Sequence, residues 1–247
     1  MTLEQAGVAL RGARRVVVLT GAGVSAESGI PTFRDALTGL WSRFRAEDLA
    51  TPEAFARDPA LVWSWYRWRR EHVLAATPNA AHRALVVIAG RVPEFTLITQ
   101  NVDGLHERAG SPSVIELHGS IVRARCTGDG HPVTAWTERE PGPPPCPECG
   151  APLRPDVVWF GESLPAASLS AAVVAAGHCD LFLSVGTSNL VEPAASLPWA
   201  AAARGATVLV INTSPEGQRS GPRVHNLIGA AATILPALVA AAFSDEA

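Results

Sequence analysis

The chain has 247 residues, the size of one domain or of one domain with a small insert, and its 47% hydrophobic content supports a folded core rather than disorder. Twenty basic and 23 acidic residues give a formal net charge of −3, which excludes a nucleic-acid binder that depends on bulk positive charge. Four cysteines are too few for a disulfide scaffold, and the N-terminus lacks the apolar stretch of a secretory signal. We therefore expect a cytoplasmic monomer with no membrane or nucleic-acid partner.

Short apolar runs rich in β-branched residues alternate with alanine-rich stretches along the chain. The runs predict strands over Arg15–Thr20, Thr96–Thr99, Leu181–Val185 and Thr207–Ile211, and the intervening stretches predict helices over Pro78–Ala89, Pro165–Gly177 and Pro193–Arg204. Such alternation is typical of an α/β fold, a Rossmann-like doubly wound sheet that is mostly parallel and covered on both faces.

Two regions interrupt this alternation. Residues 36–79 contain no good strand and are rich in aromatic residues and arginine, which predicts a helical module. Residues 121–154 hold three of the four cysteines in a segment rich in proline and glycine, which predicts a small module that cannot form its own core. The large domain then comprises residues 1–35, 80–120 and 155–247.

The uncharged segment Leu227–Phe243 could be mistaken for a membrane span. It is shorter than the roughly 20 strongly apolar residues that a span needs, and it contains Gly229 and Pro236. We expect instead a strand over Ala230–Leu235, followed by a helix with Pro236 in its first turn.

The first predicted strand ends in the turn Gly21-Ala22-Gly23-Val24-Ser25-Ala26, a G-x-G-x-x-A pattern. In dinucleotide-binding folds the two glycines allow a tight turn and a close backbone approach to a pyrophosphate, and the small third residue lets the helix pack on the strand. The second strand with an acidic residue about 20 positions later is missing, which disfavours an ordinary dehydrogenase.

Polar side chains follow two of the later strands. Gln100-Asn101-Val102-Asp103 comes directly after Thr99, and its amides and carboxylate suit a ribose and a carboxamide, although a turn rich in Asn and Asp is the alternative reading. His118 follows an apolar stretch, and an imidazole can accept a hydroxyl proton near neutral pH. The chain has seven histidines, so the residue type alone does not single this one out.

Several motifs together resemble the sirtuins, the NAD-dependent protein lysine deacylases. The resemblance covers nearly the whole chain and rests, in order, on GAGVSAESGIPTFRD (21–35), TQNVDGLHERAG (99–110), LHGS (117–120), VVWFGE (157–162), VGTSNLVEP (185–193) and INTSPEG (211–217). It implies that NAD is a consumed co-substrate: the acyl oxygen of a modified lysine attacks the ribose C1′, and the products are free lysine, nicotinamide and O-acyl-ADP-ribose.

The resemblance also assigns roles to individual residues. His118 is expected to be the general base on a ribose hydroxyl, and Asn101 and Asp103 are expected to orient NAD as part of the catalytic set. The residues expected to bind the cofactor are Gly21, Ala22, Gly23, Ala26, Thr32, Phe33, Arg34, Gln100, Asn101, Asp103, Gly186, Thr187, Ser188, Asn212, Thr213, Ser214 and Ala231.

A second set of residues is expected to bind the acylated protein lysine. Tyr66 and Arg69 are three apart, so a helix would place them on one face, where a guanidinium and a phenol can bind a carboxylate. This Tyr-x-x-Arg pair and the small residue Ala50 resemble the sirtuin branch that removes succinyl, malonyl and glutaryl groups. Val157, Trp159 and Phe160 are expected to hold the substrate peptide as an added strand, on the side of the large domain.

Sirtuins carry four cysteines around a structural zinc ion, and this chain departs from that pattern. Cys146 and Cys149 form an intact C-x2-C pair, but the first pair reads Cys126-Thr-Gly-Asp129. We expect a structural zinc ion held by Cys126, Cys146 and Cys149, with Asp129 as the fourth ligand through oxygen. His131 is the alternative fourth ligand, and a degenerate, empty site is the alternative to zinc binding. Cys179 precedes a buried strand and is expected to be a core thiol.

Two other functions use the same NAD site. An ADP-ribosyltransferase would have no use for a carboxylate-binding pair such as Tyr66 and Arg69. A non-catalytic NAD sensor would not need Asn101, Asp103 and His118. The sequence therefore favours a deacylase with a preference for acidic acyl groups.

Overall fold

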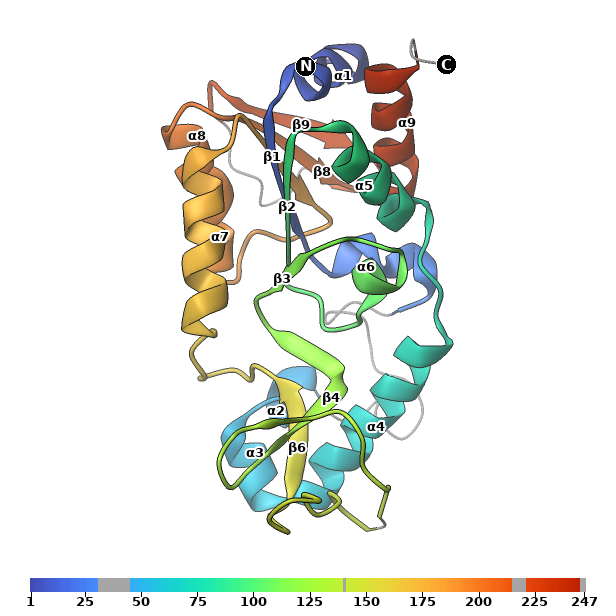
Figure 1. Cartoon of the computed structure of the whole chain (residues 1–247), viewed down its shortest axis with the longest axis vertical. Helices are drawn as coiled ribbons and strands as arrows, with labels where there is room; N and C mark the ends of the chain where they lie inside the picture. The colour runs from blue at the N-terminus through green and yellow to red at the C-terminus, as the bar shows by residue number, and fades with distance from the viewer. Residues whose placement is uncertain (31–44, 140, 215–220, 245–247) are drawn as a thin grey trace.

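The computed structural model describes residues 1–30, 45–139, 141–214 and 221–244. The molecule is elongated, with a large α/β unit at one end and a smaller unit at the other (Figure 1). The chain passes between the two units after α4 (Pro59–Ala75), before β4 (Gly119–Cys126) and after β6 (Leu153–Val157).

A six-stranded parallel sheet forms the centre of the large unit, in the order β3-β2-β1-β7-β8-β9. This is the strand order of a Rossmann fold, in which the order reverses between the first and fourth strands of the sheet, here β1 and β7. The strands are β1 Arg15–Thr20, β2 Glu94–Thr99, β3 Val114–Glu116, β7 Leu181–Val185, β8 Thr207–Asn212 and β9 Val224–Ile228.

Helices cover both faces of this sheet (Figure 1). Along β1, Val16 and Val18 pack with one helix layer and Val17 and Leu19 with the other, because successive side chains of a strand point to opposite faces. One layer contains α1 Leu3–Gly12, α5 Ala80–Arg91 and α9 Ala231–Phe243, and the other contains α7 Ala166–His178 and α8 Leu197–Ala203, which follows the short helix η4 Ala194–Ser196. The predicted α/β class and doubly wound sheet are confirmed.

The C-terminal prediction was wrong. The last strand is β9, Val224–Ile228, and Ala230–Leu235 is not a strand, because α9 already begins at Ala231 and holds Pro236 in its interior. Strand β9 lies at the sheet edge and exposes Asn226 and Ile228, so it lacks the continuous apolar run that revealed the inner strands.

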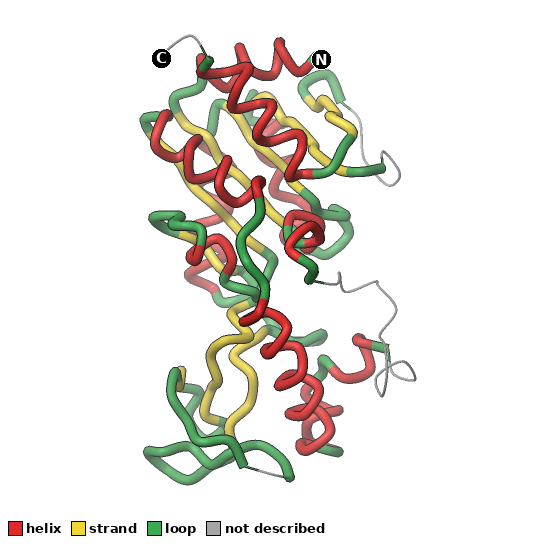
Figure 2. The backbone as a smooth tube through the Cα atoms, turned by 90° about the vertical axis from the view of Figure 1, so that its right-hand side faces the viewer, coloured by secondary structure: helices red, strands yellow, loops and turns green. Residues whose placement is uncertain are grey.

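The smaller unit combines the helical segment and the cysteine-containing segment. Its sheet has the order β5-β4-β6, and α4 lies beside this sheet (Figure 2). Side chains of the helices and of the sheet share two hydrophobic clusters, one containing Trp65 and Ile121 and the other Trp63 and Leu153. Its elements are α2 Ala46–Leu49, α3 Pro52–Arg57, α4 Pro59–Ala75, β4 Gly119–Cys126, β5 Pro132–Val133 and β6 Leu153–Val157.

No single helix among the described residues is long and apolar enough to cross a membrane, although α4 and α5, bent by 67° relative to each other, pass on length and composition as a pair.

Candidate active site

The turn after β1 packs directly against the loop after β7. The Gly21 amide donates to the Val185 carbonyl (3.0 Å) and the Gly23 amide to the Gly186 carbonyl (2.8 Å). A Cβ on Gly23 would lie 2.8 Å from the Gly186 Cα, so only glycine permits this approach. The two loops therefore meet at the carboxyl ends of the two strands where the sheet order reverses, the position at which ligands bind in such sheets.

This turn differs from the expected dinucleotide cradle. Two short helices, η1 Ala22–Val24 and η2 Ala26–Ser28, follow β1 in place of a long helix, and Ala26 is exposed rather than packed on the strand. The amides of Gly21 and Gly23 already donate to carbonyls, so the glycines serve the contact between the loops. The expected cofactor residues Thr32, Phe33 and Arg34 lie outside the described residues.

Asn101 and Asp103 are joined by a buried serine. The Ser25 hydroxyl donates to Asp103 Oδ2 (2.8 Å) and accepts from Asn101 Nδ2 (3.1 Å), while the Leu105 amide donates to Asp103 Oδ1 (2.9 Å). The sequence predicts no role for Ser25. The only feature of the sequence that could have indicated one is its position in the turn after β1. The network fixes the orientation of both predicted NAD-orienting side chains before any ligand binds.

The Asp103 carboxyl lies in a largely dry environment. It is only 5% exposed, and burial raises its pKa, while the hydrogen bonds from Leu105 and Ser25 act in the opposite direction. A carboxylate held in this way is a strong hydrogen-bond acceptor, because little water competes for it.

The other predicted cofactor residues gather at the same edge of the sheet. Gln100 Nε2 donates to Thr187 Oγ1 (2.9 Å) and Asn212 Nδ2 donates to the Thr187 carbonyl (3.0 Å), which joins the ends of β2, β7 and β8. The partly buried Ser188 and Ser214 and the exposed Thr213 lie beside these residues in the chain, and Ala231 packs in the core at the start of α9. The described residues predicted to bind NAD thus extend from the turn after β1 to the end of β8 and the start of α9.

The His118 imidazole has one nitrogen engaged by the backbone. Its Nδ1 lies 2.9 Å from the Gln100 carbonyl oxygen, and a carbonyl only accepts, so Nδ1 carries the proton and Nε2 holds the free lone pair. Burial lowers the pKa of His118, with the hydrogen bond to Gln100 acting against that shift. The imidazole is therefore neutral near pH 7 and able to accept a proton.

The predicted acyl-binding residues lie together in the smaller unit. Ala50, Tyr66, Val157 and Trp159 belong to one buried cluster, and Trp159 Nε1 donates to the Tyr66 hydroxyl (3.0 Å). The Arg69 guanidinium lies 5.8 Å from the centre of the Tyr66 ring, so the helical spacing does place the pair on one face of α4.

The location of the predicted peptide strand needs a correction. Val157 is the last residue of β6, which pairs antiparallel with β4 in the small sheet, and it is not an edge strand of the large sheet. Residues 158–160 continue along the junction of the two units: the Val158 amide donates to the His118 carbonyl and the Phe160 amide to the Ala50 carbonyl, both at 2.9 Å. Phe160 is 46% exposed.

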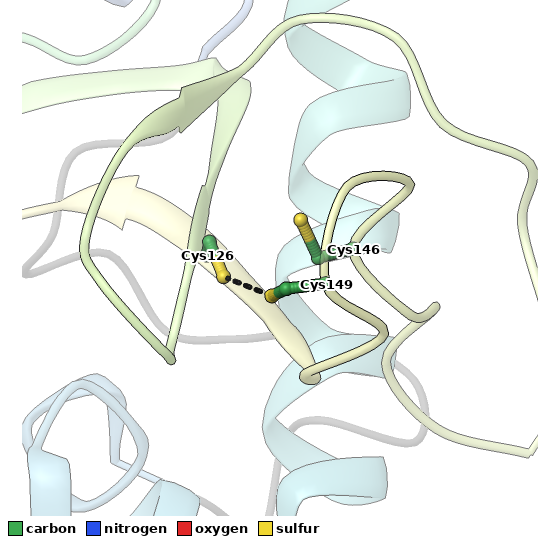
Figure 3. Close-up of side chains that lie close together, drawn as sticks. All are labelled: Cys126, Cys146 and Cys149. Carbon is green, nitrogen blue, oxygen red and sulfur yellow. Dashed lines mark hydrogen bonds between the residues drawn. The ribbon is translucent and has the colours of Figure 1, made fainter.

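Three cysteines lie close together in the smaller unit (Figure 3). The Sγ atoms of Cys126, Cys146 and Cys149 all lie within 4.8 Å of one another. Three thiols from two turns are a donor set that zinc prefers, so the cluster is compatible with structural zinc. Cys179 is 9% exposed and burial raises its pKa to about 11, as expected for a core thiol.

Known proteins share this arrangement over almost the whole chain. The NAD-dependent protein deacylase 1 of Pseudomonas aeruginosa is 55% identical over 242 residues, 95% of this chain and 96% of that protein. A deacylase of Methylococcus capsulatus is 55% identical over 240 residues, 94% of each chain. A Sir2 homologue solved as its NAD complex superposes with a TM-score of 0.88 at 44% identity, covering 98% of this chain and 94% of that one. Residues 21–193 match the model of the Sir2 family, and the chain belongs to that family.

Proposed function

We propose that this Sir2-family enzyme removes succinyl and malonyl groups, and acetyl groups as well, from the lysine side chains of proteins. The family makes it an NAD-dependent protein deacylase. In the proposed reaction NAD and one water molecule are consumed, nicotinamide and the free lysine amine are released, and the acyl group leaves on ADP-ribose.

The observation that carries the acidic-acyl proposal is the buried pairing of Tyr66 with Arg69 beside Ala50. Tyr66 is 4% exposed, and burial raises its pKa to about 12, so the phenol stays protonated at working pH. The Tyr66 hydroxyl oxygen accepts from Trp159 Nε1, and the phenolic proton can be donated to a carboxylate oxygen of the acyl group. Arg69 adds a positive charge in a half-buried position, where charge-assisted hydrogen bonds to a carboxylate are strong.

The small side chain of Ala50 supports the same proposal. Ala50 is 4% exposed and packs in the cluster that contains Tyr66 and Trp159. A methyl group at this position occupies less space than a larger apolar residue would, which favours an acyl chain one or two carbons longer than acetyl, as in malonyl and succinyl.

His118 would carry the proton transfer of the reaction. Bound NAD supplies the electrophilic C1′ that the acyl oxygen attacks as nicotinamide leaves. Nε2 of His118 would then take the proton of a ribose hydroxyl, whose oxygen attacks the acyl carbon. Asn101 and Asp103, held by Ser25, would fix the orientation of the reacting ribose and the carboxamide.

The proposal is tested by comparing kcat/KM for succinyl-lysine and acetyl-lysine peptides in the R69M variant. Each lost charge-assisted hydrogen bond costs about 1.5–3 kcal/mol, so desuccinylation should fall roughly 10–150-fold for one such bond, while deacetylation changes less than about threefold. R67M is the matched control, because Arg67 lies on the same helix but makes an ion pair with Glu71. It should leave both activities unchanged.

An equal loss of both activities in R69M would contradict the carboxylate-binding role. A wild-type enzyme that releases no nicotinamide with any acyl-lysine peptide would contradict the deacylase function itself. The chain contains no lysine, so every acyl-lysine signal in these assays comes from the substrate.

A further inference from the structure

The cysteine cluster has three thiols, and a tetrahedral zinc site needs a fourth donor. With Zn–S bonds of about 2.3 Å, tetrahedral geometry separates neighbouring sulfur ligands by about 3.8 Å and a sulfur from a nitrogen ligand by about 3.5 Å. Cys126 Sγ lies 3.3 Å from Cys149 Sγ, within about half an ångström of that spacing. In a tetrahedral site the donor atom of the remaining ligand lies at a similar distance from each of the three sulfurs.

His131 places a nitrogen donor at this spacing from one of the three thiols. Its Nε2 atom lies 3.5 Å from Cys146 Sγ, and its side chain is 24% exposed. The Cys126 amide donates to the His131 carbonyl (3.0 Å), which closes the turn from residue 126 to residue 131 and brings the imidazole back to the thiols. Gly130, with φ of +82°, supplies the left-handed residue in this turn.

Asp129 already forms hydrogen bonds with His131. Its Oδ1 atom accepts from His131 Nδ1 (2.5 Å) and from the His131 backbone amide (3.2 Å), and the side chain is 66% exposed. A carboxylate on Nδ1 fixes the tautomer in which the lone pair is on Nε2, the atom that lies 3.5 Å from Cys146 Sγ. Histidine ligands of metals are commonly oriented by an outer carboxylate in this way.

We propose that Cys126, Cys146, Cys149 and Nε2 of His131 bind one zinc ion, with Asp129 outside the coordination sphere as the hydrogen-bond partner of His131. This assigns the fourth position to the histidine and not to the aspartate that occupies the family's cysteine position. The proposal concerns the structural metal and does not depend on which acyl group the enzyme removes.

Two carboxylates are the rival donors. Asp129 also offers a carboxylate oxygen within 4.8 Å of the Cys126 sulfur, and its Oδ1 atom already accepts from two N–H groups of His131. Glu148 Oε1 lies 3.6 Å from His131 Nε2 and its side chain is 74% exposed. Among soft thiolates, zinc favours an imidazole over an exposed carboxylate that would have to give up water and existing partners.

The site would tie together two parts of a segment that has little core of its own. Cys126 ends β4, Cys146 lies in the loop before β6, and both are buried against Trp63 of α4. A zinc ion at this point crosslinks the turn after β4 to the loop before β6 and supplies stability that the proline-rich sequence cannot.

The decisive measurement is zinc K-edge X-ray absorption of the purified full-length enzyme, together with its zinc content. We expect one zinc per chain, three sulfurs at about 2.3 Å, one nitrogen at about 2.0–2.1 Å, and the outer-shell scattering of a single imidazole. Four sulfurs, three sulfurs with an oxygen and no imidazole, a Cys126–Cys149 disulfide, or less than about 0.1 zinc per chain after incubation with zinc(II) would each overturn the proposal.

Three variants separate the roles of the neighbouring residues. D129N should keep one zinc and the imidazole signal but bind zinc(II) about 10–100-fold more weakly in competition with a chelator. H131Q should lose the imidazole signal and bind zinc more weakly than D129N does, whereas E148Q should match the wild type in both. Retention of full zinc affinity in H131Q would refute the assignment, and the wild-type spectrum decides the question even if a variant fails to fold.

Discussion

Lowering the pH from 7.5 to 5 should cost the folded protein about 4 kcal/mol, because two buried imidazoles have to remain neutral in the native state. His82 on α5 and His106 on α6 (Leu105–Arg108) are 0% and 1% exposed, and their rings lie 4.8 Å apart. Burial lowers the pKa of His82 to about 4, assisted by Arg83, and that of His106 to about 3, assisted by His82.

The sign and the size follow from proton linkage. Between pH 6.5 and pH 4 the unfolded chain binds protons that the folded chain refuses, so the free energy of unfolding falls as the pH falls. With an unfolded pKa of about 6.5, each histidine contributes about 2 kcal/mol at pH 5 and almost nothing at pH 7.5. Small domains have a total stability of only about 5–15 kcal/mol, so this loss should be easy to measure.

The pair also connects to the predicted NAD site. His106 Nε2 lies 2.9 Å from Thr20 Oγ1, which lies 2.9 Å from Thr99 Oγ1, and that oxygen accepts from the Asn101 amide (3.0 Å). Protonation that opens the pair should therefore loosen Asn101 before the whole chain unfolds, and the KM for NAD should rise in the same pH range.

Urea unfolding followed by the fluorescence of the seven tryptophans gives the free energy at each pH. In the H82Q/H106Q double variant the free energy of unfolding should depend much less on pH. H178Q, which changes an exposed histidine at the end of α7, should behave like the wild type. The reasoning is refuted if the wild type loses less than about 1 kcal/mol between pH 7.5 and pH 5, or if the double variant keeps the wild-type slope.

Three further predictions concern the site itself. S25A removes the bridge between Asn101 and Asp103, so kcat/KM for NAD should fall by roughly 5–150-fold, equivalent to about 1–3 kcal/mol, with nicotinamide release as the measurement. H118A should lower kcat by about 100–10,000-fold, and because burial lowers the pKa of His118, the acidic limb of the wild-type pH–rate profile should lie below pH 6.5. G186A should lower the melting temperature by several degrees, since residue 186 has φ of +60° and a Cβ there would overlap the turn after β1; an unchanged melting temperature would contradict this.

The sequence determined the inner strands of the large sheet and the motifs at their ends. Strands such as β1 and β7 are buried on both faces, so their apolar runs are continuous and can be read without a structure. Glycines at residues 21 and 23 marked the turn correctly, and the polar residues after β2 lie at the same sheet edge as that turn, because parallel strands place their carboxyl ends at one edge of a sheet.

Tertiary structure decided the features that depend on residues distant in the chain. Strand β9 has an exposed edge and carries no apolar signal of its own, and Val157 belongs to the small sheet only because β6 pairs with β4. The bridge through Ser25 and the approach of His131 to Cys146 join residues 78 and 15 positions apart. Local patterns report burial and turn chemistry, but such contacts arise only when separate segments pack against one another.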